Sequence, residues 1–171
     1  MNNKEERYIL SNLNIFYEIA KDSYELAIQE LEKHRTPKND GGYLIMFDPK
    51  RKSFKNSLIS ISFSGSYLDL HLKISYIIKF NEIPPKKWRM NNPYKNKLES
   101  LGITEKRLIY LCEKFSTARN DVSHEKPIIE GIESDFAHET AQDSAQFGIE
   151  LIEAVRSALP LFDYNKTNNI S

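Results

Sequence analysis

A helical repeat of apolar residues near the N-terminus constrains the fold of this chain most. Between residues 5 and 34, apolar side chains recur at alternating steps of three and four positions, the spacing of one face of an α-helix. This face consists of Ile9, Leu13, Phe16, Ala20, Tyr24, Ala27 and Leu31. The apolar edge is narrow and the opposite face is acidic, as in a helix that packs within a bundle. We therefore predict an all-α fold.

Residues 57–80 are compatible with two structures. Apolar and polar residues alternate on both sides of Ser64-Gly65-Ser66, which is typical of a β-hairpin. On a helical wheel the same residues form two apolar stripes with serines between them. The first stripe is Ile59, Phe63, Tyr67, Leu70, Ile74 and Ile77, and the second is Leu58, Ile61, Gly65, Leu68, Leu72 and Tyr76. Because an isolated two-stranded hairpin is marginally stable, we predict a central helix buried on two sides, with a second subunit as one possible neighbour.

Two more long helices follow. A third helix is predicted from Thr104 to His124, with its buried face at Leu108, Leu111, Cys112, Phe115, Ala118 and Val122. The last helix is predicted over residues 135–159 and is stopped by Pro160. One of its faces is small (Ala141, Ala145, Gly148 and Ile152), which allows two helices to approach closely.

Two connecting segments are rich in turn-forming residues. Residues 35–56 contain the Gly41-Gly42 pair and are interpreted as a loop or small excursion. Residues 81–103 contain three prolines and one short helix at residues 95–100. We predict a single helical domain over residues 1–160, with four to five helices in total, and a flexible tail over residues 161–171.

Composition indicates a soluble globular protein. Of the 171 residues, 40% are hydrophobic and 28% are charged, and the N-terminal residues contain acids without a continuous apolar run. We therefore expect a cytoplasmic protein that does not associate with a membrane. The single cysteine, Cys112, fits a reducing compartment and is interpreted as a small core residue.

The net charge of zero conceals a segregation of charge along the chain. Residues 35–56 carry six basic and two acidic side chains, and residues 81–107 carry seven and three. Such segments can follow a nucleic-acid backbone, although they are equally typical of solvated loops. The predicted RNA-binding residues are Lys50, Arg51, Lys52, Lys86, Lys87, Trp88, Arg89 and Lys126. For Trp88, stacking on a base and pinning the loop to the core are both open.

The end of the third predicted helix contains the residues best suited to chemistry. Asn120 and His124 are four positions apart, so they share a helix face, and Arg119 can reach over the same patch. Arg offers a planar cation for a phosphate, and His can take and give a proton near neutral pH. This pairing suits metal-independent cleavage of a phosphodiester, and the candidate catalytic residues are Arg119, Asn120 and His124. The six residues from Arg119 to His124 alone are also typical of a solvated helix end. Asp69 or His71 on the central helix could face this motif. The positions between the two apolar stripes, where both residues lie, are better explained by close helix packing.

Arg119, Asn120 and His124, with four residues between Arg and His, resemble the signature motif of HEPN domains. The resemblance covers roughly residues 5–160, and the motif is its specific part. It implies a helical bundle that dimerises through the central and motif-bearing helices, so that two motifs face each other. Many members are metal-independent RNases that leave a cyclic phosphate, often as toxins or phage-defence effectors. In the branch that is neutralised by a nucleotidyltransferase antitoxin, the modified Tyr follows the His by two residues, and here that position is Lys126.

Two functions follow as expectations. The first is an endoribonuclease that cuts single-stranded or loop RNA without a metal or cofactor, acts as a homodimer, and has an antitoxin or defence-system protein as a further partner. The alternative is a non-catalytic module of the same kind that dimerises or binds RNA or a nucleotide. A third, weaker idea, a nucleotide-binding regulator, lacks a Gly-rich phosphate loop.

Overall fold

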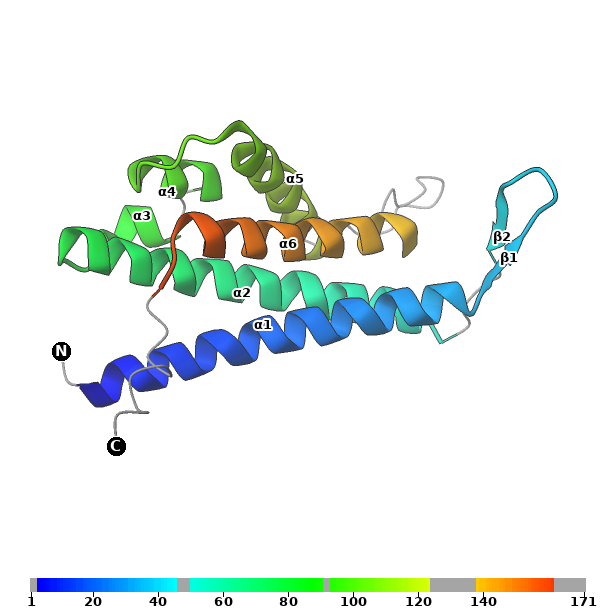
Figure 1. The fold of residues 1–171 in the computed structure, drawn as a ribbon, viewed down its shortest axis with the longest axis horizontal. Helices are drawn as coiled ribbons and strands as arrows, with labels where there is room; N and C mark the ends of the chain where they lie inside the picture. Colours follow the sequence, from blue (N-terminus) through cyan, green and yellow to red (C-terminus); the bar gives the residue numbers. More distant parts are fainter. Residues whose placement is uncertain (1–2, 46–49, 91–92, 124–137, 162–171) are drawn as a thin grey trace.

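The computed structural model describes residues 3–45, 50–90, 93–123 and 138–161. These residues form six helices and one small hairpin, so the predicted all-α class is confirmed, while the helices number six and not four to five (Figure 1). The helices are α1 (Asn3–Glu32), α2 (Lys52–Phe80), α3 (Lys86–Met90), α4 (Tyr94–Ser100), α5 (Lys106–Ser123) and α6 (His138–Ala158). The hairpin pairs β1 (Arg35–Pro37) with β2 (Tyr43–Ile45) in antiparallel fashion.

The central helix is α2, and the ambiguity over residues 57–80 is resolved in favour of a helix. α1 packs along one side of α2 and α6 along another, while α5 lies over α6 and also contacts α2 (Figure 1). The core fills the space between them, with Leu68 and Leu72 of α2 and Leu151 and Ile152 of α6 completely buried. A helix with two apolar sides therefore finds both of its neighbours within one chain.

Residues 35–56, predicted as a loop or small excursion, contain two regular elements. One is the β1–β2 hairpin, whose turn uses Gly41 at a φ of 84°, a left-handed conformation that glycine adopts without strain. In addition, α2 begins at Lys52, five residues before the predicted start of the central helix. Strands of three residues are too short to produce a readable alternation, which explains why the sequence pattern missed them.

The seams between the two apolar stripes of α2 are buried more deeply than parts of the stripes themselves. Ser60 and Ser64 are fully buried, whereas Ile59 is 41% exposed. The small serines allow α6 to approach α2 closely, because a Cβ atom added at Gly148 would lie 2.9 Å from the Ser64 Oγ atom. The predicted small face of the last helix is confirmed at this contact.

His71 is a buried titratable group of α2 that contacts Leu159, the residue that follows α6. Its exposed fraction is 2%, its Nε2 atom lies 2.9 Å from the Leu159 carbonyl oxygen, and its Nδ1 atom lies 3.1 Å from the Tyr67 hydroxyl. Since a carbonyl only accepts, Nε2 donates and Nδ1 accepts from Tyr67, which fixes one neutral tautomer. Burial lowers the pKa of His71 to about 4, although the bond to Leu159 opposes this change.

We expect His71 to make the fold sensitive to acid between pH 6.5 and 4. Above pH 6.5 the imidazole is neutral in both the folded and the unfolded chain. Below it the unfolded chain binds the proton first, so the free energy of unfolding falls by about 3 kcal/mol across this window. Urea unfolding at several pH values checks this, with His71→Gln as the comparison, because an amide can still donate to Leu159 but does not titrate. The same acid sensitivity in both proteins would assign the effect to other groups.

Candidate active site

The motif-bearing end of α5 is fixed by the buried face of that helix. The face consists of Leu108, Leu111, Cys112, Phe115 and Ala118, all at most 5% exposed. Arg119 follows directly, and its side chain lies at the edge of the buried face with 36% of its surface exposed. Asn120 is fully on the exposed side of the helix. His124, the third predicted catalytic residue, lies outside the described residues.

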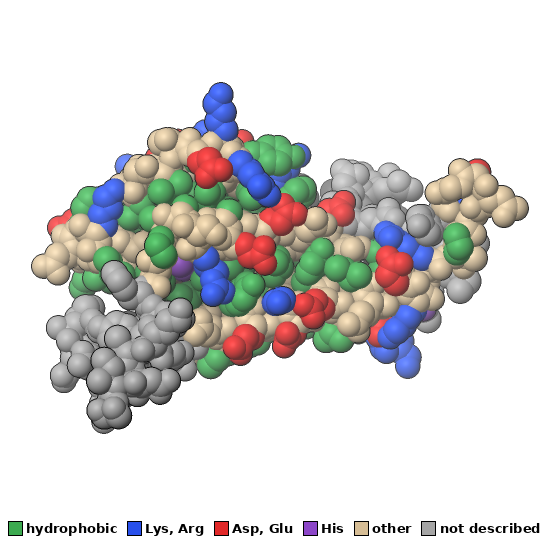
Figure 2. Space-filling model, in the orientation of Figure 1, with side chains coloured by type: hydrophobic (Ala, Val, Ile, Leu, Met, Phe, Trp, Pro, Cys, Tyr) green, Lys and Arg blue, Asp and Glu red, His purple; other side chains and the backbone are tan. Residues whose placement is uncertain are grey.

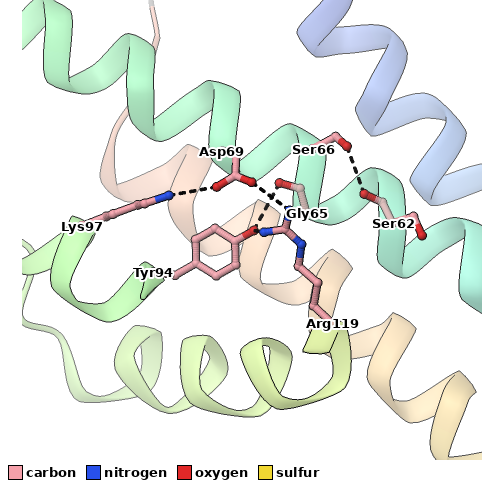
Figure 3. A network of polar contacts seen from close by, with 7 residues as sticks. All are labelled: Ser62, Gly65, Ser66, Asp69, Tyr94, Lys97 and Arg119. Atoms are coloured by element: carbon pink, nitrogen blue, oxygen red, sulfur yellow. Dashed lines mark hydrogen bonds and ion pairs between the residues drawn. The ribbon is translucent and has the colours of Figure 1, made fainter. Parts of the chain in front are cut away.

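The Arg119 side chain is held against α2 by three features. Its Nη2 atom lies 2.9 Å from the Asp69 Oδ2 atom, and its Nη1 atom donates to the Tyr94 hydroxyl (Figure 3). Its Cδ, Nε and Cζ atoms lie over Gly65, where an added Cβ atom would come within 2.7 Å of Nε. Asp69 follows Gly65 by four positions, so both lie on the same face of α2. A glycine therefore opens the space for the arginine, and an aspartate one turn further along receives its charge.

Asp69 binds a second cation through its other carboxylate oxygen. The Lys97 Nζ atom lies 3.0 Å from Oδ1, and the Lys97 side chain is only 6% exposed. This buried ammonium also lies 5.5 Å from the centre of the Trp88 ring and 5.4 Å from that of Tyr94, within the range of cation–π attraction. One carboxylate thus pairs with two basic side chains, so the formal charge of the Lys97–Asp69–Arg119 cluster is positive at a partly exposed site.

Tyr94 links α4 to this cluster as a neutral hydrogen-bonding group. It is 5% exposed, and its hydroxyl donates to the Gly65 carbonyl oxygen at 3.3 Å while accepting from Arg119. Burial raises the pKa of Tyr94 well above its usual value, and the negative charge of Asp69 raises it further. The phenol therefore stays protonated at neutral pH and acts as a fixed tether.

Cys112 occupies the core about two helical turns before Arg119. Its side chain is 1% exposed, and burial raises the pKa of its thiol to about 12. A thiol of this kind is a poor nucleophile at neutral pH. The interpretation of Cys112 as a core residue is confirmed.

The direction of α5 determines which end of the bundle the motif faces. Ser64 contacts Gly148 and His71 contacts Leu159, so α6 runs in the same direction as α2. Phe115 approaches Gly148, whereas the first turn of α5 lies beside residues 154–158 of α6, so α5 runs the opposite way. The C-terminal end of α5 therefore points toward the start of α2 and the hairpin (Figure 1).

The predicted RNA-binding residues fall into two groups at opposite ends of α2. Lys50, Arg51 and Lys52 are exposed at its start, on the side to which the motif-bearing end of α5 points. Lys86 and Lys87 are exposed on α3, near the other end. The side chain of Arg89 and the whole of Lys126 lie outside the described residues. Acidic side chains, by contrast, are spread along α1 and α6 on the face seen in Figure 2.

The prediction of Trp88 as a base-stacking residue is corrected, and the alternative holds. Trp88 is 9% exposed, packs on Tyr76 at 4.9 Å between ring centres, and donates from Nε1 to the Ser100 hydroxyl at 2.9 Å. Its ring has no free face for a base because the core and Lys97 occupy it. Lys86 and Lys87, which precede it on α3, are exposed.

Sequence reasoning missed most of the residues that hold Arg119. The sequence places Asp69 on the central helix, where it could face the motif, but it does not indicate that Tyr94 contacts Arg119. Lys97 was counted as a loop charge, yet it is buried. The available signal was a Gly and an Asp four positions apart on an otherwise apolar helix, which marks a place for a long cationic side chain but does not identify the cation.

Other candidate features lie away from the motif. An open hollow of about 440 Å³ lies between the first turn of α5 and the end of α6, lined by Glu105, Arg107, Glu150 and Glu153 among others. Within the described part of the chain, no three His, Cys, Asp or Glu side chains gather as a metal site would require. None of the helices searched there is long and apolar enough to cross a membrane.

Comparison with known proteins gives no relative to which this site can be matched. The chain matches no protein-family model, no curated protein and no solved structure. Any function must therefore be argued from the site itself and from the resemblance of its motif.

Proposed function

We propose that this protein is a metal-independent endoribonuclease of the HEPN type that cuts single-stranded or loop RNA. The observation that carries the proposal is the state of Arg119, which is held in one position by Asp69, Tyr94 and Gly65 while a third of its side chain stays exposed beside Asn120. A cation that is held in place on a partly exposed side chain suits the electrostatic stabilisation of a phosphoryl group. A toxin or phage-defence role fits this activity.

In the proposed reaction, the 2'-oxygen of RNA bonds to the adjacent phosphorus, and the bond to the 5'-oxygen breaks. His124 takes the 2' proton or gives a proton to the leaving 5'-oxygen. Arg119 stabilises the charge on the non-bridging oxygens, and Asn120 orients the phosphate or the imidazole. The products are a 2',3'-cyclic phosphate and a 5'-hydroxyl. Because one motif supplies one His, a homodimer with two facing motifs would supply both an acid and a base.

The test of this proposal is incubation of the purified protein with structured and single-stranded RNA in EDTA. We expect cleavage without metal and a cyclic phosphate on the 5' fragments, which acid converts to a monophosphate. Cleavage that requires a divalent ion, or that leaves a 3'-hydroxyl, would contradict this mechanism. The oligomeric state of the same preparation, measured by light scattering, tests the homodimer.

One observation favours the second candidate, a non-catalytic dimerisation or RNA-binding module. The charge of Arg119 is already paired with Asp69, so the arginine could serve only to join α5 to α2. In that case a folded, dimeric protein would show no cleavage in the same assay, and Arg119→Ala would lower stability alone.

We expect RNA to run over the hairpin end of the bundle, because α5 directs the motif to that end. Lys50→Gln with Arg51→Asn removes two charges there, and Asn tolerates the left-handed backbone of Arg51, which has a φ of 50°. The matched control is Lys86→Gln with Lys87→Gln. For an uncleavable 2'-O-methyl RNA, the slope of log affinity against log salt should fall by about 1.4 in the first variant, because each phosphate contact to a single strand contributes about 0.7. The control should keep the original slope, and equal changes in both variants would contradict this path.

A further inference from the structure

We infer that Asp69 is a positioning residue of the site, which fixes the orientation of the Arg119 guanidinium relative to the bound phosphate. The inference rests on the proposed function and adds to it a residue from α2, far from the motif in sequence. Asp69 and Arg119 meet through one carboxylate oxygen and one guanidinium nitrogen at 2.9 Å (Figure 3). The role proposed here is to limit the motion of Arg119, while Arg119 itself contacts the phosphate.

The two tethers of Arg119 restrict it in different directions. Asp69 takes Nη2 and Tyr94 takes Nη1, so both ends of the planar fork are fixed. The Cδ, Nε and Cζ atoms already lie against Gly65, so this end of the side chain cannot move closer to α2. A guanidinium has five N–H donors, so donors remain for a phosphate on the exposed side of the group. The orientation of those donors is then set by Asp69 and Tyr94 before any substrate arrives.

Lys97 explains how a carboxylate can hold Arg119 without cancelling the charge of the site. It binds the opposite oxygen of Asp69 at 3.0 Å and is buried between two aromatic rings, so it keeps the carboxylate in place from the inner side. Asp69 therefore shares its negative charge between two cations. The exposed side of the cluster, where Arg119 lies, keeps positive charge available for a phosphate.

Removing the charge of Asp69 is expected to change RNA binding and reaction rate in different ways. Loss of a negative charge beside the site should strengthen or preserve RNA binding, since the phosphate is also negative. Loss of the tether should slow the reaction, since a displacement of about 1 Å of a reacting group can cost roughly 10²-fold in rate. If Asp69 served only the folding of the chain, its replacement would not lower the rate while preserving RNA binding. It would also not change the motion of the Arg119 side chain specifically.

The experiment measures the steady-state kinetics of cleavage and the RNA affinity for Asp69→Asn, which keeps the shape of the side chain. We expect kcat to fall by about 10- to 100-fold while KM stays constant or falls. Tyr94→Phe removes the other tether without a change of charge, and kcat should fall by a smaller factor. Asp69→Glu, which can still reach a mobile guanidinium, should recover part of the rate. Glu113→Gln is the matched control, because Glu113 is an exposed carboxylate on α5 that pairs with Lys95 at 3.2 Å.

A second readout reports on Arg119 directly. The NMR signals of its guanidinium N–H groups should show slow rotation in the natural protein and fast rotation in Asp69→Asn, whether or not RNA is present. Unchanged kcat in Asp69→Asn, with active natural protein, would overturn the positioning role and leave the nuclease proposal intact. If the natural protein cuts no RNA, the nuclease proposal falls. Loss of slow rotation in Asp69→Asn would then show that Asp69 only ties Arg119 to α2, which would overturn its positioning role in a reaction.

Discussion

Replacing Arg119 with alanine is expected to reduce the rate of RNA cleavage by about 10²- to 10³-fold, and replacing His124 by about 10²- to 10⁴-fold. Arg119 supplies the charge that stabilises the phosphoryl oxygens, and His124 supplies the proton transfer. The two losses should not add in the double variant, because both residues act in the same step. The measurement is initial rate in EDTA with a defined single-stranded RNA.

Controls decide whether such a loss reflects chemistry. Arg119→Lys keeps the charge but not the planar fork that can bind Asp69 and a phosphate together, so it should recover only a small part of the activity. Lys114→Ala removes an exposed cation from the same helix and should leave the rate unchanged. Residual cutting with the same products in Arg119→Ala, from a preparation of equal purity, would point to a different catalytic group or to a contaminating enzyme.

The helices of this fold were predictable because their signal is local. α1 and α2 each cover about 30 residues, so the spacing of their apolar side chains repeats over many turns and outweighs the competing alternation in α2. Short elements do not have this advantage. The hairpin has three residues in each strand and α3 has five residues in total, too few for any period to be recognised.

The candidate site was only half predictable, because its two halves are distant in the sequence. The motif near residue 120 could be identified by residue type and spacing alone. Asp69 lies 50 positions earlier, and nothing local to α2 indicates that its partner is Arg119. Trp88 illustrates the opposite error, since basic neighbours suggested a surface residue while the ring faces the core. Which side of a short helix turns inward depends on tertiary packing, here on Tyr76 and Ser100.

Phe115→Ala is expected to lower the free energy of unfolding by about 3–5 kcal/mol, the largest effect on stability that we predict. The Phe115 side chain is completely buried at the point where α5 meets α2 and α6. Its ring also stacks on Tyr94 with 6.1 Å between ring centres, so it supports the helix that carries the second tether of Arg119. Urea unfolding gives the value, and Tyr110→Ala is the control, because Tyr110 is an aromatic of α5 that is 51% exposed and should cost less than about 1 kcal/mol.

A second substitution shows whether the ring acts by filling the space beside Gly148. A Cβ atom at Gly148 would come within 2.8 Å of the Phe115 ring and 2.9 Å of the Ser64 hydroxyl, so Gly148→Ala alone should cost about 1–3 kcal/mol by overpacking. In the Phe115→Ala background the ring no longer opposes that methyl group, and only the contact with Ser64 remains. The cost of Gly148→Ala should therefore be smaller there, which gives a coupling energy between the two positions of about 1 kcal/mol. Additive costs would mean that α5 and α6 do not meet through this ring, and the motif would then lack the support on which its orientation depends.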